Sequence, residues 1–341
     1  MIVQKKDLMV LYQRNLLKSL GELKFTQFKL RLLKIMGVGL VTLSVIAYLF
    51  GPIFYDIFQE IPRINQIKQQ LSDFLSSIFF GQLIPLFFAS LAITVLLLLY
   101  YYFLRKSFRS AYKKSVVEKI VKMIDPEIIY LPDRNMASSH FTASSLFDDV
   151  NSYYGDDYVE GTYKGVKYSF SEIHAHRITT DSEGHKHVHH VFDGLFLVSS
   201  HSRTNKSTTL IIPEESVFFL SAILRKIIPS AKTSRNGKDV VRLENPNFEK
   251  IFEVYSDDQV SARMLLTPVL MEKLIAYRRK YGHNIYLSFK DSTFYLAVSF
   301  EDKEIFEPSI FGDIVSFNNV REIFDLLTIT ISIIDSLNDN P

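Results

Sequence analysis

The stretch IMGVGLVTLSVIAYLFGPIFY occupies residues 35–55 and contains no charged side chain. Its 21 residues would span about 32 Å as a helix, enough to cross a hydrocarbon core of about 30 Å. A second charge-free run extends from Phe74 to Leu104, and Pro85 near its start limits the spanning part to residues 83–104. Core helices of soluble proteins rarely lack charge for so long, so the sequence predicts two transmembrane helices.

The charges that flank these runs predict an orientation. Residues 1–34 carry eight Lys or Arg and residues 105–124 carry seven, whereas the connector, residues 56–82, carries two. Positive charge is retained on the cytoplasmic side of a membrane, so both termini should be cytoplasmic and the connector external. The first run begins only after 34 residues and no small-residue cleavage site follows it, which excludes a cleaved signal peptide.

Three segments border the predicted spans. Residues 1–34 form a basic amphipathic segment, and residues 105–124 continue the second span as a basic helical stalk. Apolar residues at helical spacing in 61–74 predict a short interfacial helix in the external connector. The two basic segments could lie on anionic lipid or pack against each other, and the sequence favours neither alternative.

Composition excludes several chemistries. The chain of 341 residues has no Cys, so it has no disulfide, thiolate metal site, catalytic cysteine or iron–sulfur centre. Its net charge of +2 hides an uneven distribution. Residues 1–124 carry 17 Lys or Arg and 6 Asp or Glu, a net charge of +11. Residues 125–341 carry the other 22 Lys or Arg and 31 Asp or Glu, a net charge of −9. An acidic domain argues against nucleic-acid binding. No Walker loop, dinucleotide fingerprint, HExxH or GxSxG motif is present.

Residues 125–341 are long enough for a domain with its own core. Alternating patterns and turn residues predict a series of strands at 158–163, 166–178, 185–200, 208–212 and 239–243. They also predict four helices: 217–228, a helix capped by Ser256, a helix from Thr267 to Gly282, and 318–337. Residues 285–290 and 294–300 are predicted to form a hairpin. Strands in series followed by helices indicate an α+β domain with an antiparallel sheet, for which a pleckstrin-homology-like barrel is one fitting arrangement.

One long segment of this domain resembles a known family. The segment runs from Asn245 through FEVYSDDQVSARMLLTP (252–268) to Leu274, and Phe192–Phe196 and Phe306–Pro308 add to the likeness. It is similar to a bacterial membrane family known as domain of unknown function 3137. The resemblance covers most of residues 145–338. It implies a two-span protein of the bacterial inner membrane that accompanies LemA-like membrane proteins, and it implies no catalytic residue.

Histidines are the one group that suggests site chemistry. Six of the nine lie within residues 174–190, on two predicted strands joined by the turn Asp181–Gly184. If His176 pairs with His189, alternate residues bring four imidazoles to one face of the hairpin. These are His174, His176, His187 and His189. Such a set could hold Zn²⁺, Ni²⁺ or Cu²⁺; the alternative is a solvated arm that happens to be rich in histidine.

These observations favour an interaction function. We expect a membrane-anchored scaffold or adaptor that presents an acidic cytoplasmic domain and works in a larger membrane complex. The family resemblance adds a LemA-like membrane protein as its partner, a homo-oligomer is also expected, and no resident cofactor is needed. A metal or stress sensor that uses the histidine hairpin is the alternative, with Zn²⁺ as the ion. A membrane enzyme without a recognisable motif is a third possibility.

Overall fold

A computed structural model describes residues 5–59, 84–214, 237–300 and 304–338. The chain divides into two compact units. Residues 13–115 and 308–316 form one, called here the helical unit, and residues 1–12, 116–307 and 317–341 form the other, the sheet unit. The helices expected at 61–74 and 217–228 lie outside the described residues.

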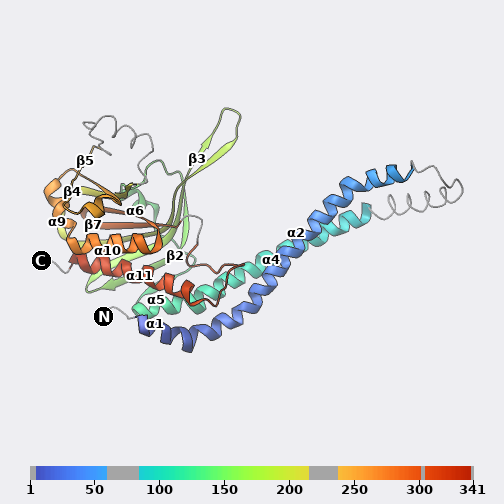
Figure 1. Cartoon of the computed structure of the whole chain (residues 1–341), viewed down its shortest axis with the longest axis horizontal. Helices are drawn as coiled ribbons and strands as arrows, with labels where there is room; N and C mark the ends of the chain where they lie inside the picture. The colour runs from blue at the N-terminus through green and yellow to red at the C-terminus, as the bar shows by residue number, and fades with distance from the viewer. Residues whose placement is uncertain (1–4, 60–83, 215–236, 301–303, 339–341) are drawn as a thin grey trace. The chain divides into compact units, whose positions relative to one another are not determined.

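Two long helices dominate the helical unit. Helix α2 runs over Leu17–Gln59 and α4 over Ile84–Tyr112, and the two pack along each other (Figure 1). Ser44 and Ser90 join them through a hydroxyl–hydroxyl hydrogen bond of 2.9 Å. Large apolar side chains on both helices are exposed, such as Leu43 at 66% and Leu96 at 65%. This exposure is what a lipid-facing surface requires.

One helix among the described residues, Phe87–Ile124, is long and apolar enough to cross a membrane. It includes most of α4, a π-helical turn at Lys113–Val117 and α5 (Glu118–Ile124). The other predicted span, residues 35–55, is part of α2, but its crossing of a membrane is not confirmed. The structure therefore supports membrane association through one helix, and the orientation stays a prediction.

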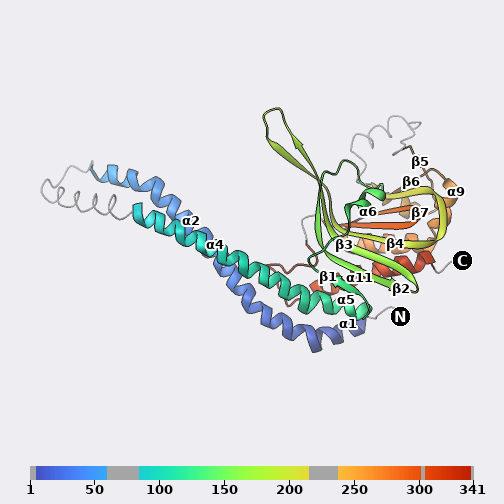
Figure 2. The same cartoon turned by 180° about the vertical axis from the view of Figure 1, so that it is seen from behind.

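The sheet unit contains a seven-stranded sheet in which every described pairing is antiparallel. Its strands are β1 (Ile129–Leu131), β2 (Ser152–Tyr163), β3 (Val166–Thr180), β4 (Lys186–Pro213), β5 (Asp239–Val240), β6 (Phe252–Ser256) and β7 (Asn284–Ser299). The order is β1-β2-β3-β4-β6-β5, with β7 beside β4. The far ends of β3 and β4 form a hairpin that projects from the sheet (Figure 2).

Strand β4 organises the sheet because it pairs along both edges. Its first part pairs with β3 and residues 209–213 pair with β6 on the same edge, while β7 follows the other edge from residue 194 to residue 211. The expected hairpin of 285–290 and 294–300 is therefore wrong: β7 is one bent strand. Asp291, which suggested a turn, has a φ of 55° and bends the strand while both halves keep their pairing with β4.

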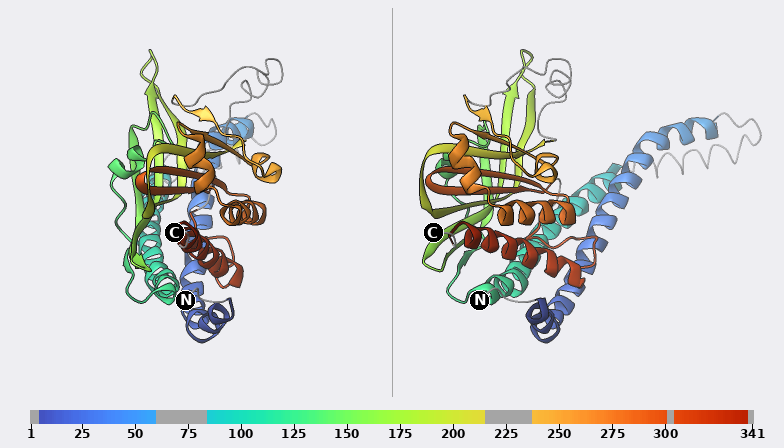
Figure 3. Two further views of the ribbon diagram at one scale, coloured as in Figure 1. Left: turned by 90° about the vertical axis from the view of Figure 1, so that its left-hand side faces the viewer. Right: turned by 60° about the vertical axis from the view of Figure 1, so that its left-hand side comes forward.

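Helices cover the sheet. Helix α10 (Pro268–Tyr281) contacts β7 and α11 (Phe317–Asn338), and α11 also contacts β4 and α5 (Figure 3). The short α6 (Ser138–Ala143) supplies Phe141, which packs 5.0 Å from Phe196 between ring centres. Shorter helices lie at Lys5–Leu11 (α1), Pro246–Glu249 (α8) and Gln259–Leu265 (α9). An α+β domain with an antiparallel sheet is confirmed.

The helix ends show which local rules predicted structure correctly. Thr267 caps α10 by accepting a hydrogen bond from the Leu270 amide at 3.3 Å, and Gly282 ends it with a left-handed φ of 74°, as predicted. The cap expected at Ser256 is wrong, because Asp258 caps α9. Ser256 instead ends β6, where its buried hydroxyl contacts the Thr209 hydroxyl at 3.0 Å.

Replacing the α10 cap tests this assignment. Thr267→Ala leaves the Leu270 amide without its side-chain acceptor, so we expect a loss of about 0.5–2 kcal/mol in the free energy of unfolding. Thr267→Ser keeps an acceptor and is the matched control, with a smaller loss. Denaturant titration followed by circular dichroism measures both, and equal losses would contradict the capping role.

Candidate metal centre

The turn of the projecting hairpin is longer than its sequence suggested. Thr180 pairs with Lys186, so the loop comprises the five residues Asp181–His185 instead of four. Asp181 closes it by accepting hydrogen bonds from the amides of Glu183 at 2.9 Å and His185 at 2.8 Å. Gly184 has a φ of 88°, a conformation that favours glycine.

This extra residue changes the register of the histidines. His176 pairs with His190 instead of His189, while Arg177 pairs with His189 and Thr179 with His187. A shift of one residue moves side chains to the opposite face of a strand pair. Of the four expected ligands, His174 and His176 therefore share one face, and His187 and His189 lie on the other.

A β-bulge completes the set on the first face. Ala175 pairs with Phe192 and His176 with His190, so Val191 is an additional residue on β4. The bulge offsets the alternation of β4 and brings Asp193 to the same face as His190. The next residue, Gly194, has a φ of 155°, and a Cβ there would lie 2.1 Å from the Val298 carbonyl oxygen of β7.

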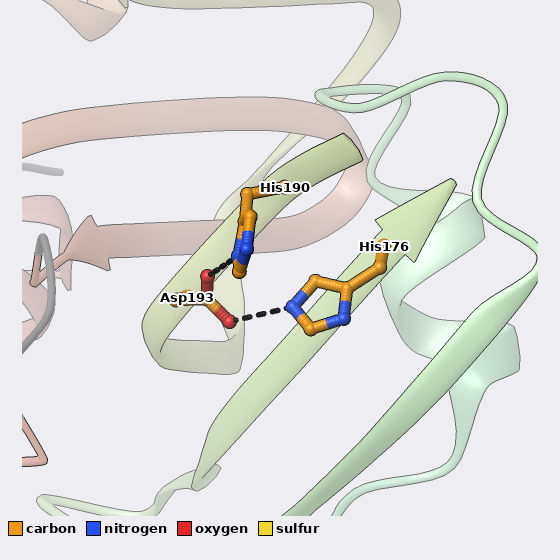
Figure 4. A group of neighbouring side chains, drawn as sticks. All are labelled: His176, His190 and Asp193. Atoms are coloured by element: carbon orange, nitrogen blue, oxygen red, sulfur yellow. Dashed lines mark hydrogen bonds and ion pairs between the residues drawn. The ribbon is translucent and has the colours of Figure 1, made fainter. Parts of the chain in front are cut away.

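Three imidazoles converge on the Asp193 carboxylate. His174 Nδ1 lies 2.8 Å and His176 Nε2 3.1 Å from Oδ1, and His190 Nδ1 lies 2.9 Å from Oδ2. Figure 4 shows His176 and His190 pointing from neighbouring strands toward Asp193. The centroids of their two rings are 4.5 Å apart.

The cluster lies at the boundary between the sheet and the exposed hairpin. His176 is buried at 8% exposure, whereas the His190 side chain is 69% exposed. Tyr154 on β2 stacks on the His174 ring at 4.9 Å and so forms one wall. Metal or small ligands could reach the cluster from the side of His190.

Hydrogen bonding sets the charge state of the cluster. Partial burial opposes ionisation of Asp193, but hydrogen bonds from the three imidazoles outweigh it and hold the pKa of the carboxyl well below its usual range. The hydrogen bond to Asp193 raises the pKa of His174 above its ordinary 6.5, against the effect of burial. The cluster thus favours a carboxylate beside a protonated imidazole.

The same atoms have the spacing of metal ligands. One ligand atom each from His176, His190 and Asp193 lie within 4.8 Å of one another. Two ligands of a tetrahedral zinc ion, each about 2.0–2.1 Å from it, lie about 3.3 Å apart. His176 Nε2 lies 3.1 Å from Oδ1 of Asp193, and His190 Nδ1 lies 2.9 Å from Oδ2, so each imidazole is close to that separation from a different oxygen of the carboxylate. Two imidazoles with one carboxylate also suit other divalent transition metals.

The remaining hairpin histidines make other contacts. His185 and His187 lie 3.2 and 3.0 Å from the Asp181 carboxylate at the tip, and His189 Nε2 lies 3.3 Å from the Thr179 hydroxyl. His190 and Asp193 were missed as ligands because the bulge that unites them cannot be read from alternation. The sequence feature that could have indicated them is the Asp193-Gly194 pair shortly after the histidines, because a glycine inside a strand often marks a bulge or a close approach of another strand.

Comparison with known proteins confirms the family resemblance for part of the chain. Residues 190–339 match the family described as "Protein of unknown function (DUF3137)". The matched region covers less than half of the chain. It includes His190 and Asp193, while His174 and His176 precede it. The association with LemA-like proteins stays a prediction.

Other similarities are remote. No curated protein sequence matches the chain. The crystal structure of the mycobacterial trehalose monomycolate transport factor A, TtfA, is similar over 65% of this chain and 93% of its own, with 11% identity and a TM-score of 0.32. A likeness of this size assigns neither fold nor function.

The raised pKa of His174 predicts a pH dependence of stability. A protonated imidazole that is stabilised by folding contributes fully below 6.5, its ordinary pKa, and the contribution is lost as pH rises through the raised value. The melting temperature of the metal-free protein should therefore exceed that of His174→Gln by more at about pH 5.5 than at about pH 8.5. His189→Gln is the matched control. If the melting temperature of the wild type exceeds that of His174→Gln by more at high pH than at low pH, the pairing of His174 with Asp193 is contradicted.

Proposed function

We propose that the protein is a membrane-anchored scaffold or adaptor whose DUF3137 domain binds a protein partner within a larger complex. The apolar helix Phe87–Ile124 supports the anchor. The proposal includes the second span at residues 35–55, which its charge-free sequence supports, and cytoplasmic termini, which the flanking positive charges support. The bacterial inner membrane as location is proposed from the family resemblance alone. A pleckstrin-homology-like plan for the domain stays a prediction.

Exposed apolar side chains on α9 carry the interaction proposal. Val260 is 65% exposed and Met264 is 63% exposed, and their spacing of four residues puts them on one face of the helix. Val269, near the start of α10, is 61% exposed. Neighbouring exposed apolar residues on a folded domain are typical of protein–protein contact sites. We call Val260 and Met264 the α9 patch.

Charge indicates the kind of partner. Residues 125–341 carry a formal −9, with 22 Lys or Arg against 31 Asp or Glu. An acidic domain associates faster with a basic surface than with a neutral one. The partner we propose therefore combines an apolar contact with basic surroundings, and a LemA-like membrane protein or a second copy of the chain remain the candidates.

A purification from mild detergent tests the scaffold. Intact protein should retain a partner in fixed ratio, identified by mass spectrometry, and Val260→Ser with Met264→Ser should lose it because the apolar contact is removed. Val188→Ser changes a residue that is 53% exposed on the hairpin and should retain the partner. Absence of any partner from the wild type, or its retention by the α9 double variant at unchanged melting temperature, would refute the proposed contact.

The His–Asp cluster favours a second candidate function, the sensing of a metal ion. His176 and His190 are cross-strand partners, and Asp193 is held beside both. A metal bound to these three would link β3 to β4 at the base of the hairpin. Bound metal would thus restrict the arm, which is the kind of change that a sensor transmits.

Titration calorimetry of the intact, detergent-solubilised protein with Zn²⁺ tests this candidate. His176→Gln with His190→Gln should weaken binding by roughly 100-fold or more, since even residues behind the ligands contribute about 10–100-fold. The matched control is His187→Gln with His189→Gln, on the opposite face, which should bind as the wild type does. Affinity should fall as pH is lowered, because a metal ion needs neutral imidazoles. Equal binding by both double variants would exclude the cluster as the site.

A further inference from the structure

A loop that follows β7 in sequence belongs to the helical unit. Residues 308–316 are held against α2 by two side chains. Gln27 donates to the carbonyl oxygens of Ser309 at 2.7 Å and Gly312 at 2.8 Å, and Arg31 donates to those of Ile310 and Gly312, both at 2.6 Å. Four hydrogen bonds to backbone oxygens leave this loop little freedom, and Gln27 is itself buried at 2% exposure.

Phe311 lies among these anchored residues, yet its side chain is not covered. It is 56% exposed, although the carbonyls of residues 309, 310 and 312 are all bonded to α2. The turn is closed by the Gly312 amide, which donates to the Ser309 hydroxyl at 2.9 Å. An aromatic ring presented by a fixed loop, and not buried, is suited to contact something outside the protein.

The part of α2 that Phe311 lies beside indicates what its ring would contact. The Lys34 ammonium lies 4.9 Å from the centre of the Phe311 ring. Lys34 is the last charged residue before the apolar run that begins at Ile35, which is 63% exposed. Phe311 is therefore level with the point on α2 where the surface changes from basic to apolar.

That level is where a bilayer would have its headgroups. Aromatic rings gather at this boundary, and nearby Lys and Arg attract anionic lipid. Exposed Phe25 and Phe28, with Lys29 stacked on Phe25 at 4.5 Å, extend the same mixed surface along α2. A protein partner would not explain why aromatic and basic residues coincide with the start of the charge-free run.

We propose that Phe311 inserts into the headgroup region of the bilayer, so that the loop 308–316 is a membrane contact supplied by the sequence between β7 and α11. This inference rests on the membrane anchoring proposed above. Lys34 would then offer its charge to lipid phosphate while its stem and the Phe311 ring face the upper acyl chains.

The chain has no Trp, which makes a single-tryptophan experiment direct. Phe311→Trp keeps an aromatic ring over Lys34, and Leu96→Trp places a control on the exposed face of α4. Each full-length variant is reconstituted into vesicles of phosphatidylcholine and phosphatidylglycerol. Parallel samples contain lipids brominated near the headgroup or near the chain ends, and emission is compared with that in unbrominated vesicles.

Phe311→Trp should be quenched more by the shallow bromines than by the deep ones, and Leu96→Trp should show the reverse ratio. Quenching of Leu96→Trp without quenching of Phe311→Trp would overturn the loop contact and leave the anchoring intact. In that case, quenching of Phe311→Trp by aqueous iodide would show that the ring is exposed to water, and absence of iodide quenching would show that the ring is buried against protein. If neither variant is quenched, membrane anchoring itself fails.

Discussion

Pairing of β4 along both of its edges is the constraint on which the sheet unit depends. Because β7 pairs with one edge of β4 between residues 194 and 211, β3 and β6 occupy the other edge in succession, at residues 186–199 and 209–213. Residues 194–199 of β4 pair with both β3 and β7, residues 209–211 pair with both β6 and β7, and the strand supplies core residues such as Phe196 and Leu210. Strands β3, β6 and β7 pair with β4 directly, β2 and β5 are attached through one intervening strand, and β1 through two.

The His–Asp cluster is a local consequence of the same constraint. At Gly194, β7 approaches so closely that a side chain would collide with the Val298 carbonyl. The preceding Asp193 is tied through its own carbonyl, which accepts hydrogen bonds from the Phe300 amide at 2.9 Å and the Ser299 hydroxyl at 3.2 Å. Its backbone is thus fixed from the β7 side while its carboxylate faces the histidines. If the cluster binds a metal ion, as proposed, its ligands are already held in place before the ion arrives, which lowers the entropic cost of binding.

Most features that depend on local sequence could be predicted, although the cap expected at Ser256 was wrong, and those that depend on strand pairing could not. The Thr267 cap and the Gly282 stop are properties of a few neighbouring residues, and charge-free runs are properties of composition. The register of β3 and β4 instead depends on a five-residue loop and on the bulge at Val191, and one residue of error exchanged His189 for His190. Asp291 resembles a turn in isolation, yet the continuous partner β4 keeps β7 a single strand. Partner strands overrode the local signal in both cases.

Metal binding by the His–Asp cluster and partner binding by α9, both proposed above, would have different chemical requirements. An Asp193 carboxylate that accepts three imidazole hydrogen bonds is already compensated, so a metal must replace those bonds and displace protons from the ligating nitrogens. Metal would therefore bind in competition with protonation of the same imidazoles. The proposed scaffold would need no such competition, because Val260 and Met264, the exposed α9 residues proposed to contact a partner, carry no titratable group. If the protein both binds a partner and responds to metal, the response must act through the hairpin, since His176 and His190 are where the two strands of that arm are joined.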